Sequence, residues 1–80
     1  MSFSPAQCRA ARALIEMSQA DLAEVAGVSS RTVLDFEAGK RKPIKATLTV
    51  IQQALESAGV EFTNGGQPGV RFTKKGTFKR

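Results

Sequence analysis

Two short helical patterns joined by a single glycine turn constrain the fold of this 80-residue chain more than any other feature. Residues 18–43 read SQADLAEVAGVSSRTVLDFEAGKRKP. In each half a serine precedes apolar residues at helical spacing, and a glycine, Gly27 or Gly39, follows them. A capped helix begins and ends in this way. Because the turn is short, the second helix must lie across the first.

Two further helices are predicted, one on each side of this pair. Ser4-Pro5-Ala6-Gln7 combines a serine cap with proline at the first helical position and glutamine at the third, so a helix should span about residues 5–16. The helix that starts after Ser29 should run to about Ala38, and a last helix should span about residues 45–58. The predicted inward-facing residues of the four helices and the turn are Cys8, Ala11, Leu14, Ile15, Leu22, Ala23, Ala26, Val28, Val33, Phe36, Ile44, Leu48, Ile51, Leu55 and Ala58.

The periodicity changes after Gly59. Residues 60–63 and 70–73 alternate apolar and polar side chains, and a glycine-rich segment separates them, which predicts a β-hairpin. The residues expected on its apolar face are Val60, Phe62, Val70 and Phe72. Because an isolated hairpin is barely stable in water, this face must pack on the helices or on a second copy of the chain.

The expected organisation is a mainly α-helical domain over residues 1–59, a hairpin extension at 60–73 and a mobile basic tail at 74–80. Eighty residues allow one small core. The chain has no long apolar run for a membrane span and no secretory leader, so we expect no membrane association. The single cysteine, Cys8, favours a cytoplasmic protein, either as a small buried residue or, alternatively, as a reactive thiol.

Positive charge is concentrated in the second half of the chain. Residues 1–39 carry three Lys/Arg and five Asp/Glu, a net −2, whereas residues 40–80 carry nine and two, a net +7. A one-sided basic surplus on a small domain indicates either a polyanionic partner or a solubilising tail. Charge alone does not decide between them.

The arrangement from Arg12 to Pro43 resembles the phage-repressor-like (Cro/C1-type, XRE) helix-turn-helix family, and the resemblance covers about residues 8–58. The residues that carry it are Arg12, Ser18, Gln19, Leu22, Ala23, Ala26, Gly27, Val28, Ser29, Val33, Phe36, Glu37, Gly39 and Pro43. The resemblance implies a four-helix, lambda-repressor-like fold of bacterial or phage type. It also implies operator binding, usually as a homodimer, with the helix at about residues 30–38 in the major groove.

That helix should present a small, partly charged outward face. Arg31 can form a bidentate pair with guanine, and Asp35 can either accept from cytosine or hold Arg31 in an i,i+4 pair. Ser30 can bond base edges or phosphate, and Leu34 can touch a thymine methyl. These four residues are the candidates for base readout, and a merely solvated helix face is the alternative.

Candidate phosphate contacts flank the same helix. The resemblance implies that Gln19 contacts a phosphate and braces the next helix. Ser29 is first a helix cap, and the free amides at helix starts can also meet phosphates. The three basic residues after Gly39 either suit the helix dipole or neutralise phosphates. The candidates are Gln19, Ser29, Thr32, Lys40, Arg41 and Lys42.

Four residues are assigned structural roles. Arg12 and Glu37 match the family's pairing between the first helix and the end of the third, either as a buried pair or as two solvated charges. Gly27 and Gly39 should end their helices. The chain has no His and one Cys, so a zinc site with four protein ligands and the catalytic sets built on histidine are excluded. We therefore expect no enzyme activity, no metal and no cofactor.

The sequence thus predicts a cytoplasmic transcriptional regulator, in the first place a repressor, that binds double-stranded DNA as a homodimer. The last helix and the hairpin, which has a free edge, are the candidate dimer surface. One alternative keeps the fold but makes the protein an antitoxin or accessory module whose main partner is another protein, bound through the C-terminal hairpin. Another is a non-specific nucleic-acid binder driven by the basic half.

Overall fold

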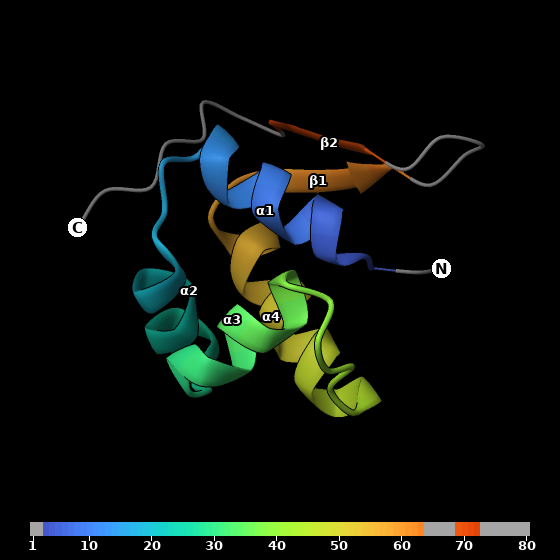
Figure 1. Cartoon of the computed structure of the whole chain (residues 1–80). Helices are drawn as coiled ribbons and strands as arrows, with labels where there is room; N and C mark the ends of the chain where they lie inside the picture. Colours follow the sequence, from blue (N-terminus) through green and yellow to red (C-terminus); the bar gives the residue numbers. More distant parts are fainter. Residues whose placement is uncertain (1–2, 64–68, 73–80) are drawn as a thin grey trace.

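The chain folds into four helices followed by a two-stranded antiparallel sheet, as the sequence predicted (Figure 1). This computed structural model describes residues 3–63 and 69–72. The predicted basic tail at 74–80 and most of the predicted hairpin turn lie outside the described residues. The elements are α1 (Pro5–Leu14), α2 (Gln19–Ala26), α3 (Ser30–Glu37), α4 (Lys45–Ser57), β1 (Val60–Thr63) and β2 (Gly69–Phe72).

Serine side chains start the first three helices, as predicted. Ser4 accepts from the backbone N–H of Gln7, whose side chain accepts in return from the backbone N–H of Ser4. Ser18 and Asp21 form the same reciprocal capping box at the start of α2, and Ser29 caps α3. These bonds satisfy amides that have no partner inside the helix, so the sequence sets the starts of the helices locally.

The helix ends lie close to the predicted positions. α1 ends at Leu14, two residues early, because Glu16 takes a left-handed conformation with φ of 58° and turns the chain so that Met17 enters the core. Gly27 and Gly39 have φ of 75° and 74°, the left-handed conformation expected where glycine ends a helix. α3 and α4 each end one residue earlier than predicted.

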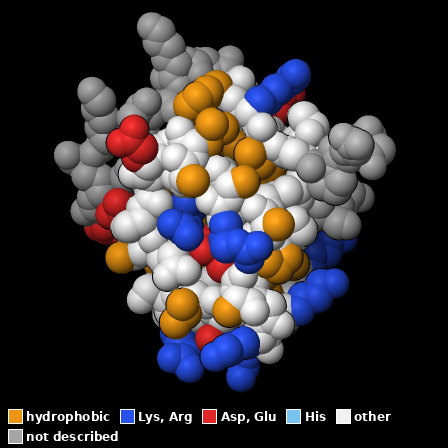
Figure 2. All heavy atoms as spheres, turned by 45° about the horizontal axis from the view of Figure 1, so that its top comes forward, with side chains coloured by type: hydrophobic (Ala, Val, Ile, Leu, Met, Phe, Trp, Pro, Cys, Tyr) orange, Lys and Arg blue, Asp and Glu red, His pale blue; other side chains and the backbone are white. Residues whose placement is uncertain are grey.

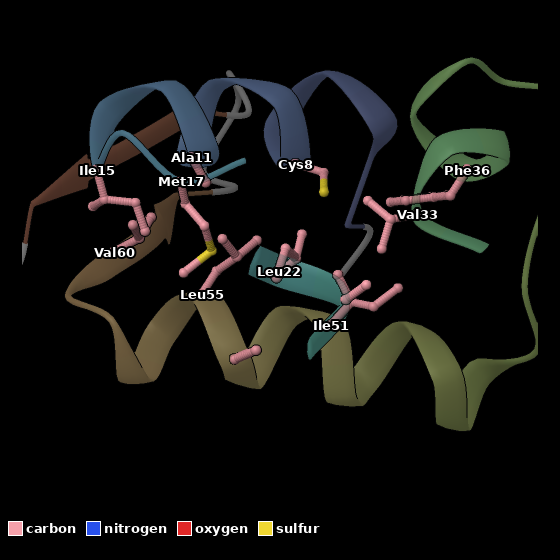
Figure 3. Close-up of a cluster of buried hydrophobic side chains, with 12 residues drawn as sticks. Cys8, Ala11, Ile15, Met17, Leu22, Val33, Phe36, Ile51, Leu55 and Val60 are labelled. Carbon is pink, nitrogen blue, oxygen red and sulfur yellow. The ribbon is translucent and has the colours of Figure 1, made fainter. Parts of the chain in front are cut away.

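All four helices and β1 contribute side chains to one core (Figure 3). Its fully buried larger side chains are Cys8, Ile15, Leu22, Val33, Ile51, Leu55 and Val60. Two predicted core residues lie outside the core: Ile44 is 73% exposed, and Leu14 is only half-buried and is not part of the buried cluster. Ile44 precedes the first turn of α4 with an extended backbone, so its side chain does not follow the inward-facing side of that helix. The prediction also missed Met17 and Ala54, which are buried.

The hairpin has the predicted apolar face. Val60 pairs with Phe72 and Phe62 pairs with Val70, and directly paired residues point to the same side of a sheet. Burial differs most across the first of these pairs, because Val60 on β1 is fully buried whereas Phe72 on β2 is exposed. β2 spans Gly69–Phe72 and so begins one residue before the predicted second strand, whose last residue, Thr73, lies outside the described residues.

Residues near the start of the chain support this hairpin. The buried side chain of Gln7 in α1 donates to the carbonyl oxygens of Thr63 at 3.4 Å and Gly69 at 3.3 Å, and so bonds to both strands. Phe3 packs edge-on against Phe62 with ring centroids 5.1 Å apart. The sheet lies at one end of the molecule, in the upper part of Figure 1, and α2 and α3 lie toward the other.

Candidate nucleic-acid interface

α3 has one buried side and one exposed side. Val33 and Phe36 are buried against the rest of the protein, as predicted from their helical phase, and Glu37 is buried beside them. Arg31 and Leu34 project from the opposite side, and the side chain of Arg31 is 74% exposed. The core thus fixes the orientation of α3 and leaves its outward residues accessible to a partner.

Two open grooves meet along the outward side of α3. The larger, of about 610 Å³, runs between α3, the loop after it and the start of α4; its lining residues are Arg31, Thr32, Asp35, Arg41, Lys42, Pro43, Ile44 and Thr47. The smaller, of about 370 Å³, lies between the starts of α2 and α3; its lining residues are Gln19, Ala20, Ser30, Arg31 and Leu34. Arg31 lines both grooves, so most predicted base and phosphate contacts lie on one continuous surface.

Two predicted phosphate contacts, Ser29 and Lys40, line neither of these grooves. Lys40 is exposed beside them at the end of α3. The hydroxyl of Ser29 caps α3 and lies 2.9 Å from the hydroxyl of Thr32. The structure therefore gives Ser29 the helix-capping role that the sequence indicated first.

Arg31 and Asp35 form the predicted i,i+4 ion pair. Nε of Arg31 lies 3.3 Å from Oδ2 of Asp35, whose side chain is only 16% exposed. This pair uses Nε of the guanidinium group, which has two further nitrogens that carry donors. Those two nitrogens are available to a guanine edge while Asp35 steadies the side chain.

The carboxylate of Glu37 joins three helices. Arg12 in α1 contacts both of its oxygens, with Nη2 at 2.6 Å from Oε1 and Nε at 2.7 Å from Oε2. Gln19 in α2 donates to Oε1 at 3.0 Å, and the thiol of Cys8 in α1 donates to Oε2 at 3.0 Å. The Glu37 side chain is 2% exposed and that of Arg12 is 18% exposed. The predicted pair is thus present, and it is the buried alternative.

These contacts shift the pKa values of the three ionisable groups. Burial raises the pKa of Glu37, but the hydrogen bonds from its partners and the charge of Arg12 outweigh burial, so the pKa lies below its ordinary value. The hydrogen bond to Glu37 raises the pKa of Arg12. Burial, followed by the bond to Glu37, raises the pKa of the Cys8 thiol far above its ordinary value. Cys8 is therefore the buried residue that the sequence favoured, not a reactive thiol.

Sequence reasoning missed two partners of Glu37 on α1. Cys8 was expected only as an apolar core residue, yet it donates to the carboxylate. Arg9 was assigned no role, yet its Nη1 donates to the backbone oxygen of Glu37. The signal for Cys8 was present, because Cys8 and Arg12 are four residues apart and therefore share one helix face.

The basic loop is tied to the end of α3. The backbone N–H groups of Lys40 and Arg41 donate to the carbonyl oxygen of Asp35 at 2.9 and 3.4 Å. These bonds direct the chain back along α3, and the side chains of the three basic residues at 40–42 are exposed.

Within the described ranges, 3–63 and 69–72, no group of His, Cys, Asp and Glu residues could hold a metal ion. No helix in those ranges has the length and apolar character to cross a membrane.

A sequence model of the helix-turn-helix family HTH_3 matches residues 9–62, more than half of the chain. The chain belongs to this helix-turn-helix family. The match confirms the predicted XRE-type resemblance. It supports a role in DNA binding and transcription regulation. Members of HTH_3 are not normally enzymes. A comparison with curated proteins found no significant match. The matched region of this HTH_3 protein ends inside β1, so β2 lies beyond it.

Proposed function

We propose that this HTH_3 protein is a transcriptional repressor that binds specific double-stranded DNA as a homodimer, with α3 in the major groove. The observation that carries the proposal is the position of Arg31, which lines both the groove toward the basic loop and the groove toward Gln19. A helix with base-reading side chains between two sets of phosphate ligands has the layout needed to enter a groove. Repression follows if the bound protein covers DNA that the polymerase needs.

Base readout is assigned to the exposed side of α3. Arg31 is the strongest candidate, because a bidentate bond to guanine O6 and N7 distinguishes guanine from the other bases. Leu34 is 42% exposed and can contact a thymine methyl. Ser30 and Asp35 complete the set; Asp35 acts through Arg31 or accepts directly from cytosine.

Phosphate binding is assigned to the two ends of this surface. Gln19 is held by Glu37 through one amide hydrogen, and its second amide hydrogen is available to a phosphate. Thr32 lines the larger groove together with Arg41 and Lys42. Lys40 lies next to them in the same exposed loop. These contacts fix the position of the protein on the duplex and add affinity that depends on salt.

Replacing Lys42 by alanine is expected to flatten the salt dependence of DNA binding. Removing one phosphate ligand lowers the slope of log affinity against log salt by about 0.9 on duplex DNA. Fluorescence anisotropy over a salt series measures the slope. Arg71→Ala is the matched control, because it also removes one positive charge but lies on β2 in a pair with Glu61. Equal slopes for Lys42→Ala and Arg71→Ala would show that general charge, not a contact from the loop, attracts the DNA.

We expect a homodimer because one α3 helix reads only a few base pairs, whereas two copies on a palindrome supply affinity and specificity. Two exposed apolar positions support the predicted dimer surfaces: Val50 on α4 and Phe72 on β2. Hydrophobic side chains also reach the surface on the face over α1 and the hairpin (Figure 2). Each described strand has one partner, so each has an edge that a symmetry mate can pair with.

Sedimentation velocity is expected to give a dimer for the wild-type protein. Val50→Ser and Phe72→Ser test the two candidate surfaces, and the variant that shifts the protein to a monomer identifies the one in use. Both side chains are exposed, so neither change should unfold the protein. A wild-type monomer at the highest soluble concentration that still binds its operator tightly would contradict the dimer.

One observation favours a second candidate function. β2 lies beyond the matched region and carries the exposed Phe72. In this alternative the protein is an antitoxin or accessory module that binds another protein through the hairpin. A protein that co-purifies with the wild type but not with Phe72→Ser would support it.

A further inference from the structure

Ile44 is the most exposed large hydrophobic residue in the described part of the chain. It occupies the position that caps α4, where Ser, Thr, Asp and Asn are preferred, and its side chain makes no capping hydrogen bond. An isolated exposed apolar residue needs no explanation. Ile44, however, lies in a groove between basic side chains.

Ile44 lines the larger groove beside α3. The same groove is lined by Arg31 and Asp35 of α3, and by Arg41 and Lys42 of the basic loop. The groove thus contains three basic side chains and one carboxylate, and that carboxylate is already paired with Arg31. This charge is complementary to a polyanion, so the partner that covers Ile44 should be nucleic acid rather than a neutral or basic protein surface.

We propose that Ile44 is an apolar contact to DNA that sets affinity or specificity at the edge of the major groove. The inference rests on the proposed DNA-binding function. Duplex DNA offers two apolar surfaces at that edge, the C5-methyl group of thymine and the carbons of deoxyribose. Between the readout residue Arg31 and the phosphate ligand Lys42, the Ile44 side chain packs on one of these surfaces and is removed from water.

Three substitutions separate the apolar contact from the stability of α4. Ile44→Val keeps most of the apolar surface, Ile44→Ala removes it, and Ile44→Thr has nearly the shape of valine but carries a hydroxyl. Because the side chain is exposed, the valine and alanine variants should melt close to wild type. The threonine variant should melt higher, because threonine can cap α4.

DNA affinity should respond in a different order from stability. With an operator duplex selected by the wild type, Ile44→Val should bind within about threefold of wild type and Ile44→Ala about tenfold more weakly. Ile44→Thr should also bind more weakly although it melts higher. The salt slope should stay unchanged in all three variants, because every phosphate ligand is still present.

Replacing each operator thymine in turn by uracil distinguishes the two apolar sources. If Ile44 touches a thymine methyl, one uracil position weakens the wild type but not Ile44→Ala. If it touches deoxyribose, no uracil position separates the two proteins, and the tenfold loss persists; either result supports the contact. Wild-type affinity in Ile44→Ala overturns the inference but leaves the proposed function intact.

Two further outcomes also count against the contact. If Ile44→Ala sediments as a monomer while the wild type is a dimer, Ile44 is a contact between protein chains and the inference is wrong. If the wild type selects no duplex sequence, the proposed function fails and the inference fails with it. The first outcome still permits specific DNA binding, so the two failures are distinguishable.

Discussion

Arg12→Met is expected to lower the free energy of unfolding by about 3–5 kcal/mol, because it leaves the Glu37 carboxylate buried without its counter-charge. Glu37 would keep only the neutral donors Cys8 and Gln19. Since Arg12 joins α1 to Glu37 of α3 by two bonds, its loss should also loosen the position of α3. Urea unfolding followed by circular dichroism measures the change.

The matched control is the exposed pair between Arg71 and Glu61, in which both side chains are well hydrated. Arg71→Met should change stability little, because an exposed ion pair contributes little. The double variant Arg12→Met/Glu37→Leu should be less destabilised than Arg12→Met alone, since it no longer buries an unpaired charge. If Arg12→Met lowers the free energy of unfolding as little as Arg71→Met does, the ion pair between Arg12 and Glu37 does not stabilise the contact between α1 and α3.

The same carboxylate predicts how stability depends on pH. The pKa of Glu37 lies below its ordinary value of about 4.5, so the ionised form is more stable in the folded protein than in the unfolded chain. Its contribution is complete above pH 4.5 and is lost as the pH falls through the folded pKa. Below pH 4.5, the melting temperature should fall more steeply with decreasing pH for wild type than for Glu37→Gln. If the melting temperatures of the two proteins fall in parallel below pH 4.5, the pKa of Glu37 is not lowered.

Arg31→Ala is expected to cost about 1–3 kcal/mol of discrimination at one base pair in each half-site, which is roughly 5- to 150-fold in relative affinity. Arg31 is exposed, so the variant should fold as wild type does. Binding to the selected site is compared with binding to sites in which one guanine is changed. The loss should be confined to that guanine.

Arg31→Lys separates the shape of the side chain from its charge. Lysine keeps the charge but has no planar fork, so it should restore non-specific affinity more fully than the preference for guanine. If Arg31→Ala lowers affinity equally for all sequences, Arg31 is a phosphate ligand and another residue reads the bases.

Local chemistry made much of the fold predictable. The capping boxes at Ser4 and Ser18 involve residues three apart, so the sequence alone shows both partners. The left-handed ends at Gly27 and Gly39 follow from the conformational freedom of glycine. Because helical periodicity is regular, the sequence also predicted that Val33 faces the core and that Arg31 on the opposite side of α3 is exposed.

Contacts between distant residues were not predictable in the same way. The bond from Gln7 to Thr63 spans 56 positions, and a glutamine in the first turn of a helix gives no sign of it. Ile44 has the correct spacing for the apolar side of α4, but it precedes the helix with an extended backbone, and spacing does not show where its side chain then points. The contact of Arg9 with the backbone oxygen of Glu37 depends on how α1 crosses α3, which is a property of the assembled core.

In the proposed function, α3 reads a specific DNA sequence. Selection of bound sites from a random duplex library at ~150 mM salt tests it most directly, because non-specific electrostatic binding is weakened at that ionic strength. We predict enrichment of a palindrome, with a guanine in each half-site whose preference disappears in Arg31→Ala. A library that shows no enrichment with folded wild-type protein would contradict the claim.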